Sequence, residues 1–489
     1  MSSQARIPNE LWSKMFGCLT TDSLVQLSHT NRLFCGISRP HLFSEFSFHP
    51  YALVNGAVKV PPSSIVQRAQ ERLAFWASPS IAPFVRSCKI TPWERGERRG
   101  PKFSTSNERY DLLNAFFDSL IHFSGLHTLH AVDIRFTQVG LTSLCNLPSL
   151  RSLCIVGQDF VPGELIDTSS LKLKHLCCFE FRNEYSFMSG TADDWIPLLR
   201  LDELHKLEVT LTPHLITVLD RIPFFPQMRT LSVRLDVLDA SQSVGLLAKF
   251  PALTELSMSQ AGHRDTIGRS LSARVPPPVL PHLKKYSGVY QTLHMFVPLP
   301  TLTHLTVDMC PPFQMMAELK NIRTPLDNIT TMHVEFVSAP DVVLDEFFGI
   351  FPALTRLQIE VADVLPLDFD FEDPDFLEDD PHWMIPEFLE ALTKTPLPPP
   401  LDQLAVFWRV ETAYLPSLPN FKKYSGLLMK KYPALKAVWF GLYGFTYRSR
   451  KAQDGTVIGE EAIADDNHET VKRMCRDFDS SWVDLEVQV

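Results

Sequence analysis

The chain lacks several features that would each define a class of protein. No stretch reaches 18 uninterrupted apolar residues, so the sequence predicts no membrane span, and its start carries no apolar signal-peptide segment. Basic residues are in the minority, since 46 Lys and Arg face 56 Asp and Glu, for a formal net charge of -10. A nucleic-acid binder normally carries a basic stripe. The sequence therefore argues against both a membrane and a nucleic acid as partners.

Cysteine pairs and catalytic motifs are also missing. The nine cysteines are scattered and form no C-x-x-C pair, which predicts reduced thiols in a cytoplasmic or nuclear protein. No G-x-S-x-G, G-x-x-x-x-G-K-[ST] or H-E-x-x-H motif occurs. We therefore expect a protein that is not an enzyme and that holds no metal and no cofactor.

The chain contains 38 prolines but only 20 glycines. This surplus of proline indicates secondary-structure elements that repeatedly end at a proline. One such proline lies in the heptapeptide FPALTEL at 250–256, which recurs as FPALTRL at 351–357. In the pattern L-x-x-L-x-h, the second Leu and the apolar residue two positions later share one face of a strand. The repeated letters are thus predicted to be buried. The sixth position, Glu255 or Arg356, is predicted to point away from the core.

Relatives of this motif follow one another along most of the chain, and apolar stretches such as 347–350 precede them as expected helices. Their anchor residues are Leu126, Leu150, Leu173, Leu204, Met228, Leu253, Leu283, Leu302, Ile329, Leu354, Leu404 and Leu435. Most successive spacings fall within or near the 20–29-residue period of leucine-rich repeats. The array resembles that family, although the Asn or Cys that usually follows the strand is generally missing. The resemblance implies an α/β solenoid, an irregular horseshoe whose exposed strand surface suits binding.

The first fifty residues follow a different pattern, IPNELWSKMFGCLTTDSLVQLSHTNRLFCGISRPHLFSEFSF. Leu11, Met15 and Leu19 recur at i, i+4 and i+8, which predicts an amphipathic helix that starts near Pro8. Asp22 is expected to cap a second helix, and a third short helix follows. Three short helices bury little apolar surface by themselves, so part of it is expected to face a partner.

This segment resembles an F-box, and the P-x-L-F that follows it at 40–43 resembles fungal members of that family. The resemblance implies that the helices dock on a Skp-family adaptor and through it on a cullin. The positions that match the family pattern, and to which it assigns adaptor binding, are Ile7, Pro8, Glu10, Leu11, Met15, Phe16, Leu19, Leu24, Leu27, Arg32, Phe34 and Ile37.

The sequence thus predicts four parts: an F-box over residues 1–50, a helical linker with a possible degenerate first repeat over 51–122, the solenoid over 123–445, and a C-terminal cap over 446–489. A strand is expected within 81–90 and a helix around 460–478. An acidic, aromatic insertion at 363–383 interrupts the array. It is expected to be a solvated loop, and the alternative is a segment that engages a basic partner. A basic loop at 93–102 is likewise expected to be solvated, and its alternative is a patch that binds a nucleic acid or a phosphopeptide.

The F-box resemblance implies the substrate-recognition subunit of an SCF-type cullin-RING ubiquitin ligase, whose repeats bind an unknown target protein. The alternative is a leucine-rich repeat scaffold outside any ubiquitin ligase, in which the N-terminal helices only cap the array. If the array recognises a target, exposed strand positions are the candidates, namely Arg234, Glu255, His304, Glu335 and Arg356.

Overall fold

A computed structural model of the chain describes residues 7–54, 57–93, 102–103, 110–157, 171–182, 192–222, 224–235, 245–260, 279–322, 325–340, 343–362, 384–411, 418–443, 445–452 and 454–463. The acidic insertion at 363–383 and most of the basic loop at 93–102 lie outside these residues. The chain divides into two compact units, Met1–Asp236 and Val237–Val489. This division falls inside the range predicted for a single solenoid.

The first unit begins with three short helices, α1 (Asn9–Phe16), α2 (Thr21–Ser28) and α3 (Arg32–Leu42). Rings of Trp12, Phe16 and Phe34 meet between them, with centroids 5.0–6.1 Å apart. The helix starts are capped by Thr20, whose side chain accepts from the Ser23 amide, and by Asn31. The predicted cap at Asp22 is therefore wrong, because that residue already lies in the first turn of α2.

Parallel strands follow in the first unit, in the order β1-β4-β6-β7-β8-β9-β10. Their bounds are β1 (Glu45–Phe48), β4 (Ser87–Ile90), β6 (Thr128–Val132), β7 (Ser152–Val156), β8 (Cys178–Arg182), β9 (Lys206–Leu211) and β10 (Thr230–Leu235). A separate small sheet contains β2 (Ala52–Val54), β3 (Ala57–Lys59) and β5 (Lys102–Phe103). The strand expected within 81–90 is β4, which pairs with both β1 and β6.

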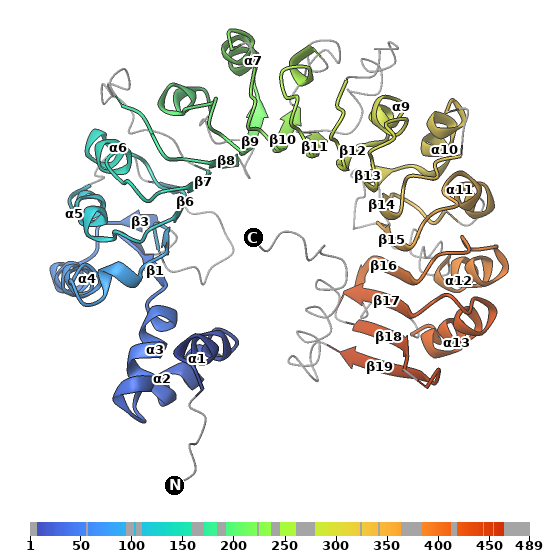
Figure 1. Cartoon of the computed structure of the whole chain (residues 1–489), viewed down its shortest axis with the longest axis horizontal. Coiled ribbons are helices and arrows are strands. Elements are labelled where there is room, and N and C mark those ends of the chain that lie inside the picture. The colour runs from blue at the N-terminus through green and yellow to red at the C-terminus, as the bar shows by residue number, and fades with distance from the viewer. Residues whose placement is uncertain are drawn as a thin grey trace. The chain divides into compact units, whose positions relative to one another are not determined.

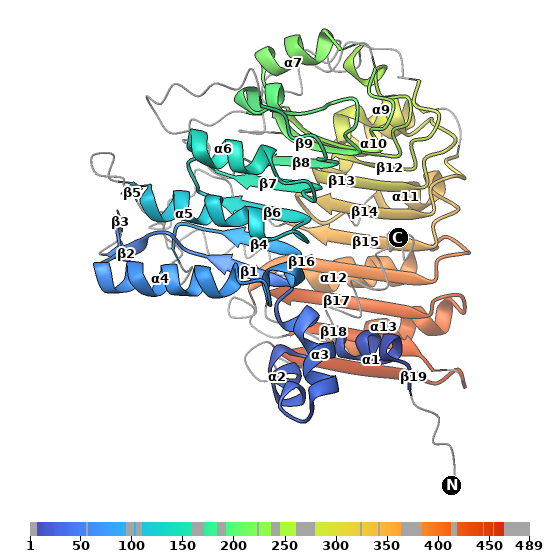
Figure 2. The ribbon, with the colours of Figure 1, turned by 60° about the vertical axis from the view of Figure 1, so that its left-hand side comes forward.

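The described helices that follow β1 in the first unit lie on one side of its parallel strands (Figure 1 and Figure 2). They are α4 (Ser63–Trp76), α5 (Asp111–Ser119), α6 (Gln138–Cys145) and α7 (Pro213–Asp220), with 3₁₀ turns η1 (Ala82–Phe84), η2 (Leu120–His122), η3 (Ala192–Asp194) and η4 (Ile196–Leu198). Phe43, directly after α3, packs edge-on against Trp76 of α4 at 5.4 Å, and Phe46 of β1 stacks on the same ring at 4.7 Å. This aromatic contact joins the helical module to the first strand.

The second unit repeats the arrangement with β11 (Glu255–Gln260), β12 (Lys285–Val289), β13 (His304–Cys310), β14 (Thr331–Phe336), β15 (Arg356–Val361), β16 (Gln403–Glu411) and β17 (Ala437–Tyr443), all parallel. Two antiparallel strands, β18 (Phe445–Lys451) and β19 (Val457–Ile463), complete its sheet. The prediction of a helix from residue 460 is therefore wrong for residues 460–463, because they belong to β19, which pairs with β18. The rest of that segment lies outside the described residues.

One face of this second sheet is backed by α9 (Leu293–Phe296), α10 (Pro312–Lys320), α11 (Leu344–Ile350), α12 (Met384–Lys394) and α13 (Phe421–Lys431), with η5 (Tyr290–Thr292) (Figure 1). In each unit we call the strand face turned away from the described helices the open face. Each unit thus has the mostly parallel, helix-backed sheet of an α/β solenoid, which confirms the predicted fold class at this level. None of the described helices is long and apolar enough to span a bilayer.

All twelve predicted anchor residues are buried, with at most 3% of their surface exposed. The two heptapeptides form the same turn, since the Leu253 amide donates to Phe250 O at 3.2 Å and the Leu354 amide to Phe351 O at 3.4 Å. Glu255 and Arg356 then lie partly exposed on the open face. The repeated letters are therefore the buried ones, as the pattern predicted.

Two anchors are misplaced by three residues. Strand pairing sets Leu153 opposite Phe179 and Leu357 opposite Leu404. The anchors equivalent to Leu150 and Leu354 are therefore Leu176 and Leu401, and not Leu173 and Leu404. Both segments carry leucines three apart (LKLKHL and LDQL), so the motif fits either register. Pairing with the neighbouring strand selects the one that buries the alternate apolar residues.

Candidate interaction surfaces

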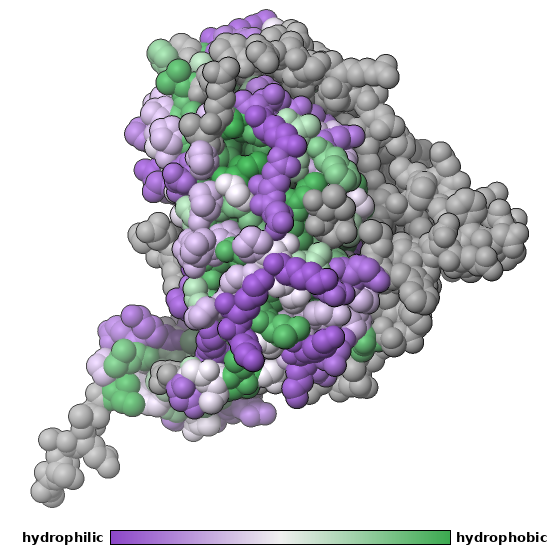
Figure 3. Space-filling model, turned by 90° about the vertical axis from the view of Figure 1, so that its right-hand side faces the viewer, coloured by the Kyte–Doolittle hydropathy of each residue, from purple (hydrophilic) through white to green (hydrophobic). Residues whose placement is uncertain are grey.

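Half-exposed apolar side chains gather on and beside α1. Leu11 and Met15 lie on this helix with 50% and 53% exposed, while Ile7 precedes it at 46% and Leu19 follows it at 39%. Green surface marks this part of the molecule at the lower left of Figure 3, on the helices next to the start of the chain. Side chains of this size are normally withdrawn from water, so their grouping indicates a surface that a partner covers.

The other residues assigned to adaptor binding have different environments. Phe16 and Leu24 are buried and form the core of the module, so they cannot be contact residues without unfolding it. A second set of exposed and half-buried positions surrounds the core: Pro8, Glu10, Arg32, Leu27 and Ile37. Phe34 is half-buried, and its ring packs in the core against Phe16. Sequence reasoning missed Val25 and Leu33, which are 42% and 50% exposed. Their signal was present, because each is an apolar residue beside the core stripe of its helix.

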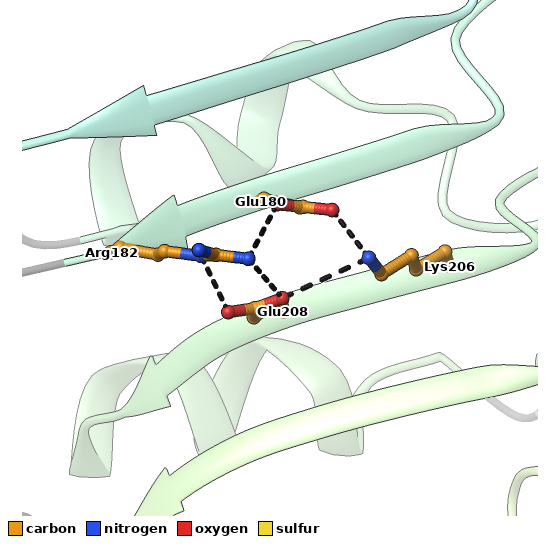
Figure 4. Close-up of polar contacts among 4 residues, drawn as sticks. All are labelled: Glu180, Arg182, Lys206 and Glu208. Carbon is orange, nitrogen blue, oxygen red and sulfur yellow. Dashed lines mark hydrogen bonds and ion pairs between the residues drawn. The ribbon is translucent and has the colours of Figure 1, made fainter. Parts of the chain in front are cut away.

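Four charged side chains form a closed network on the open face of the first unit (Figure 4). Arg182 Nε lies 2.7 Å from Glu208 Oε1, and Arg182 Nη2 lies 3.0 Å from Glu180 Oε2. Lys206 pairs with Glu180 and lies 3.9 Å from Glu208. Burial would raise the pKa of Glu180, but the hydrogen bond and charge of Lys206 outweigh it, and that pKa is lowered.

This network is electrically balanced, with two cations between two carboxylates that face each other in register, Glu180 and Glu208. Like charges in register would repel, and the cations two residues away on each strand offset this. The sequence carried a signal for this network. The order of the charges is inverted between consecutive repeats, with Glu180-x-Arg182 in one and Lys206-x-Glu208 in the next. Partly exposed pairs of this kind stabilise by about 0–1 kcal/mol each, so the network shapes the surface more than it holds the fold.

Three of the predicted target-binding residues share one row on the open face of the second unit. Strand register connects Glu255, Lys285, His304, Thr331 and Arg356, one from each of five neighbouring strands. Glu255 pairs with Lys285 at 3.5 Å, and His304 Nδ1 lies 2.8 Å from Thr303 Oγ1. The fourth candidate, Arg234, is exposed on β10 of the first unit.

Glu335 does not belong with these residues. It lies four positions further along β14 and is only 7% exposed, so its description as an exposed strand position is wrong. Arg409 reaches across β15 and places Nη1 2.8 Å from Glu335 Oε1 and Nε 2.8 Å from Glu360 Oε1. Burial raises the pKa of Glu335 in spite of this cation. Sequence could not place Arg409 here, because 49 residues separate it from Glu360.

Glu360 is the most strongly perturbed carboxylate of this group. Its Oε2 lies 3.4 Å from His333 Nε2, and this contact together with the hydrogen bond that Arg409 Nε donates lowers its pKa to about 2. A folded-state pKa below the ordinary value of 4.5 means that the group stabilises the fold above about pH 4.5. That contribution is lost as the pH falls from there toward about 2.

We therefore expect Glu360→Gln to lower the free energy of unfolding by about 1–3 kcal/mol at pH 6 and by much less at pH 2.5. Urea unfolding at the two pH values measures this difference. Glu346→Gln is the control, since the exposed pair of Glu346 with Lys320 at 3.1 Å should change stability by less than about 0.5 kcal/mol. Equal stability of Glu360→Gln and the unaltered chain at pH 6 would contradict the prediction.

Among the described residues no three His, Cys, Asp or Glu side chains are grouped so that they could hold a metal ion. The eight described cysteines are free thiols, and Cys88 and Cys310 are buried. Burial raises the pKa of both thiols well above the usual range, which makes them unreactive core residues.

Comparison of the sequence with known protein families and with curated proteins finds no match.

Proposed function

We propose that this chain is the substrate-recognition subunit of an SCF-type cullin-RING ubiquitin ligase, with an F-box at its N-terminus and irregular leucine-rich repeats behind it. The observation that carries the proposal is the apolar surface around α1. Leu11 and Met15 are half-exposed on a helix whose opposite side, through Phe16, packs into an aromatic core. This arrangement supports docking on a Skp-family adaptor in the cytoplasm or nucleus.

The physical argument concerns what the module gains by being covered. Full burial of a large apolar side chain contributes roughly 1.5–3 kcal/mol. Four such side chains that are already about half-buried therefore still hold several kcal/mol for a partner. The module's own core is small, so a partner also stabilises it.

The repeats supply the second half of the proposal. A helix-backed parallel sheet offers a long row of open-face side chains that can vary without loss of the fold, which suits recognition of a protein target. Glu255, His304 and Arg356 are the candidates that share one row. In this proposal the chain positions a target for ubiquitination and performs no chemistry itself.

Co-purification of the full chain with a Skp-type adaptor tests the proposal, beside a chain that lacks residues 1–42. The deletion ends before Phe43 because Phe43 and β1 pack with α4 and β4. Binding by the full chain that is lost on deletion supports the adaptor role. If a folded full chain fails to bind any Skp-type adaptor, the alternative of a repeat scaffold outside a ubiquitin ligase takes its place.

A further inference from the structure

A row of mostly basic residues lies at the edge of the first unit's sheet where the parallel strands begin. These residues directly precede β4, β6, β7, β8, β9 and β10, and the backbone amide of each after the first donates at 2.8 Å to the carbonyl of the previous one. We call them the basic row: Arg86, His127, Arg151, Cys177, His205 and Arg229. All but Cys177 are exposed, and all but Cys177 can carry a positive charge.

The fold does not require basic residues at this edge. In the second unit the equivalent residues are Thr254, Lys284, Thr303, Thr330, Thr355, Asp402 and Lys436. Three of the threonine hydroxyls, those of Thr303, Thr330 and Thr355, donate to the carbonyl of the previous residue in this series at 3.0–3.4 Å. A short side chain therefore satisfies the edge, and the basic row of the first unit is an addition to the repeat.

Two arginines of the row keep most of their hydrogen-bond donors. Arg86 Nη1 donates to Gly125 O at 3.3 Å. Arg151 Nη1 donates to Pro148 O and His175 O at 3.2 Å each. Neither guanidinium makes another hydrogen bond or an ion pair with the described residues. Because a guanidinium has five N–H donors in a planar fork, each is held at one nitrogen and can still bind a carboxylate through the others.

The turns that lead into these strands also hold more basic than acidic residues. They are residues 83–86, 124–127, 148–151, 172–177, 201–205 and 226–229. Residues 172–175 add two lysines and a histidine just before Cys177, and the only acids in these turns are Asp202 and Glu203. Arg200 lies 3.7 Å from Asp202 and 2.7 Å from Glu203, which offsets part of their charge. In a chain with a net charge of -10, the basic row is thus a local concentration of positive charge.

We propose that the basic row binds an extended acidic segment of a partner protein. Neighbouring strands are about 4.8 Å apart, so the six positions of the row span about 24 Å. An extended chain rises about 3.3 Å per residue, so a segment of about eight residues is long enough to follow the row. Its carboxylates match the guanidinium groups in charge and in geometry. A long nucleic acid fits less well, because the net negative charge of the chain repels a polyanion that extends beyond the row.

The inference goes beyond the proposed ligase function and does not depend on it. The basic row shares no residue with the apolar surface around α1 or with the candidate target-binding residues of the second unit. The row would serve a scaffold outside any ubiquitin ligase in the same way. If the chain does recognise a target for ubiquitination, the row predicts that the target presents an acidic segment.

Fluorescence anisotropy of a labelled octaglutamate peptide with the full chain, at low ionic strength, tests the proposal. Arg86→Thr/Arg151→Thr gives both positions the residue that the second unit carries at Thr303 and Thr330, so the fold should persist. We expect this variant to bind the peptide about tenfold more weakly, because two charge-assisted contacts are lost. Thermal unfolding of both chains checks that the variant is folded.

Arg39→Gln/Arg68→Gln is the matched control, because it removes two positive charges from exposed positions on α3 and α4 of the same unit. It should change the affinity by less than about twofold. Added salt should weaken binding by the unaltered chain severalfold, a test that needs no variant.

Three results would overturn the inference. The first is equal affinity of the Arg86→Thr/Arg151→Thr variant and the unaltered chain for octaglutamate. The second is no binding of octaglutamate by the unaltered chain, or binding that salt leaves unchanged. The third is tighter binding of a labelled octathymidylate than of octaglutamate, which would assign the basic row to a nucleic acid.

Discussion

Leu11→Asp/Met15→Asp is expected to lower the affinity for a Skp-type adaptor at least about a hundredfold. Two half-exposed apolar side chains lose contacts of roughly 0.75–1.5 kcal/mol each, and two carboxylates that would be buried against the adaptor add a desolvation cost. Both side chains are half-exposed in the free chain, so aspartate should be tolerated there without loss of the fold. Isothermal titration calorimetry against the purified adaptor measures the change. Circular dichroism of the same samples checks that the helices remain.

Asn9→Asp/Lys14→Asp is the matched control, because both residues are exposed positions of the same helix beside the apolar surface. It adds negative charge as the test variant does and should change the affinity by less than about tenfold. Phe16→Asp is unsuitable as a test, since Phe16 lies 5.4 Å from Phe34 in the module core. Unchanged binding by Leu11→Asp/Met15→Asp would show that α1 does not contact the adaptor.

Leu354→Ala is expected to lower the free energy of unfolding of the second unit by about 2–5 kcal/mol. Leu354 is fully buried behind the turn that starts β15, and its loss leaves a cavity between the sheet and α11. Denaturant unfolding of the full chain measures this, and the change should appear in the transition that belongs to the second unit. The same substitution at Leu253, the equivalent residue of the earlier heptapeptide, should have an effect of the same size.

Arg356→Glu provides the control, because it writes the earlier heptapeptide FPALTEL into the later copy. The residue is partly exposed on the open face, so the charge reversal should cost less than about 1 kcal/mol. A large loss of stability from Arg356→Glu, or a negligible loss from Leu354→Ala, would contradict the assignment of buried and exposed positions in the repeat.

The repeat pattern predicted the α/β class because every copy places leucines at the same offsets, and such offsets bury one face of a strand. The same pattern misplaced two anchors, at Leu173 and Leu404, because leucines three apart fit two registers equally well. The strand within 81–90 was predicted, whereas β1 at Glu45–Phe48 was read as the end of the helical module. Four residues carry too short an alternation to be distinguished from the end of a helix.

Sequence alone thus determined which residues enter the core. The spacing of Leu253 and Leu256 requires burial of the same face in every repeat, whichever residues the adjacent strands contribute. Only the tertiary structure decided how the remaining polar residues interact. Glu335 became a buried partner of Arg409, 74 residues further along the chain, and Glu180 became a partner of Lys206, 26 residues further along. Periodicity is a local property of the chain and predicts burial, whereas charge pairing across strands depends on register, which the packing of whole repeats sets.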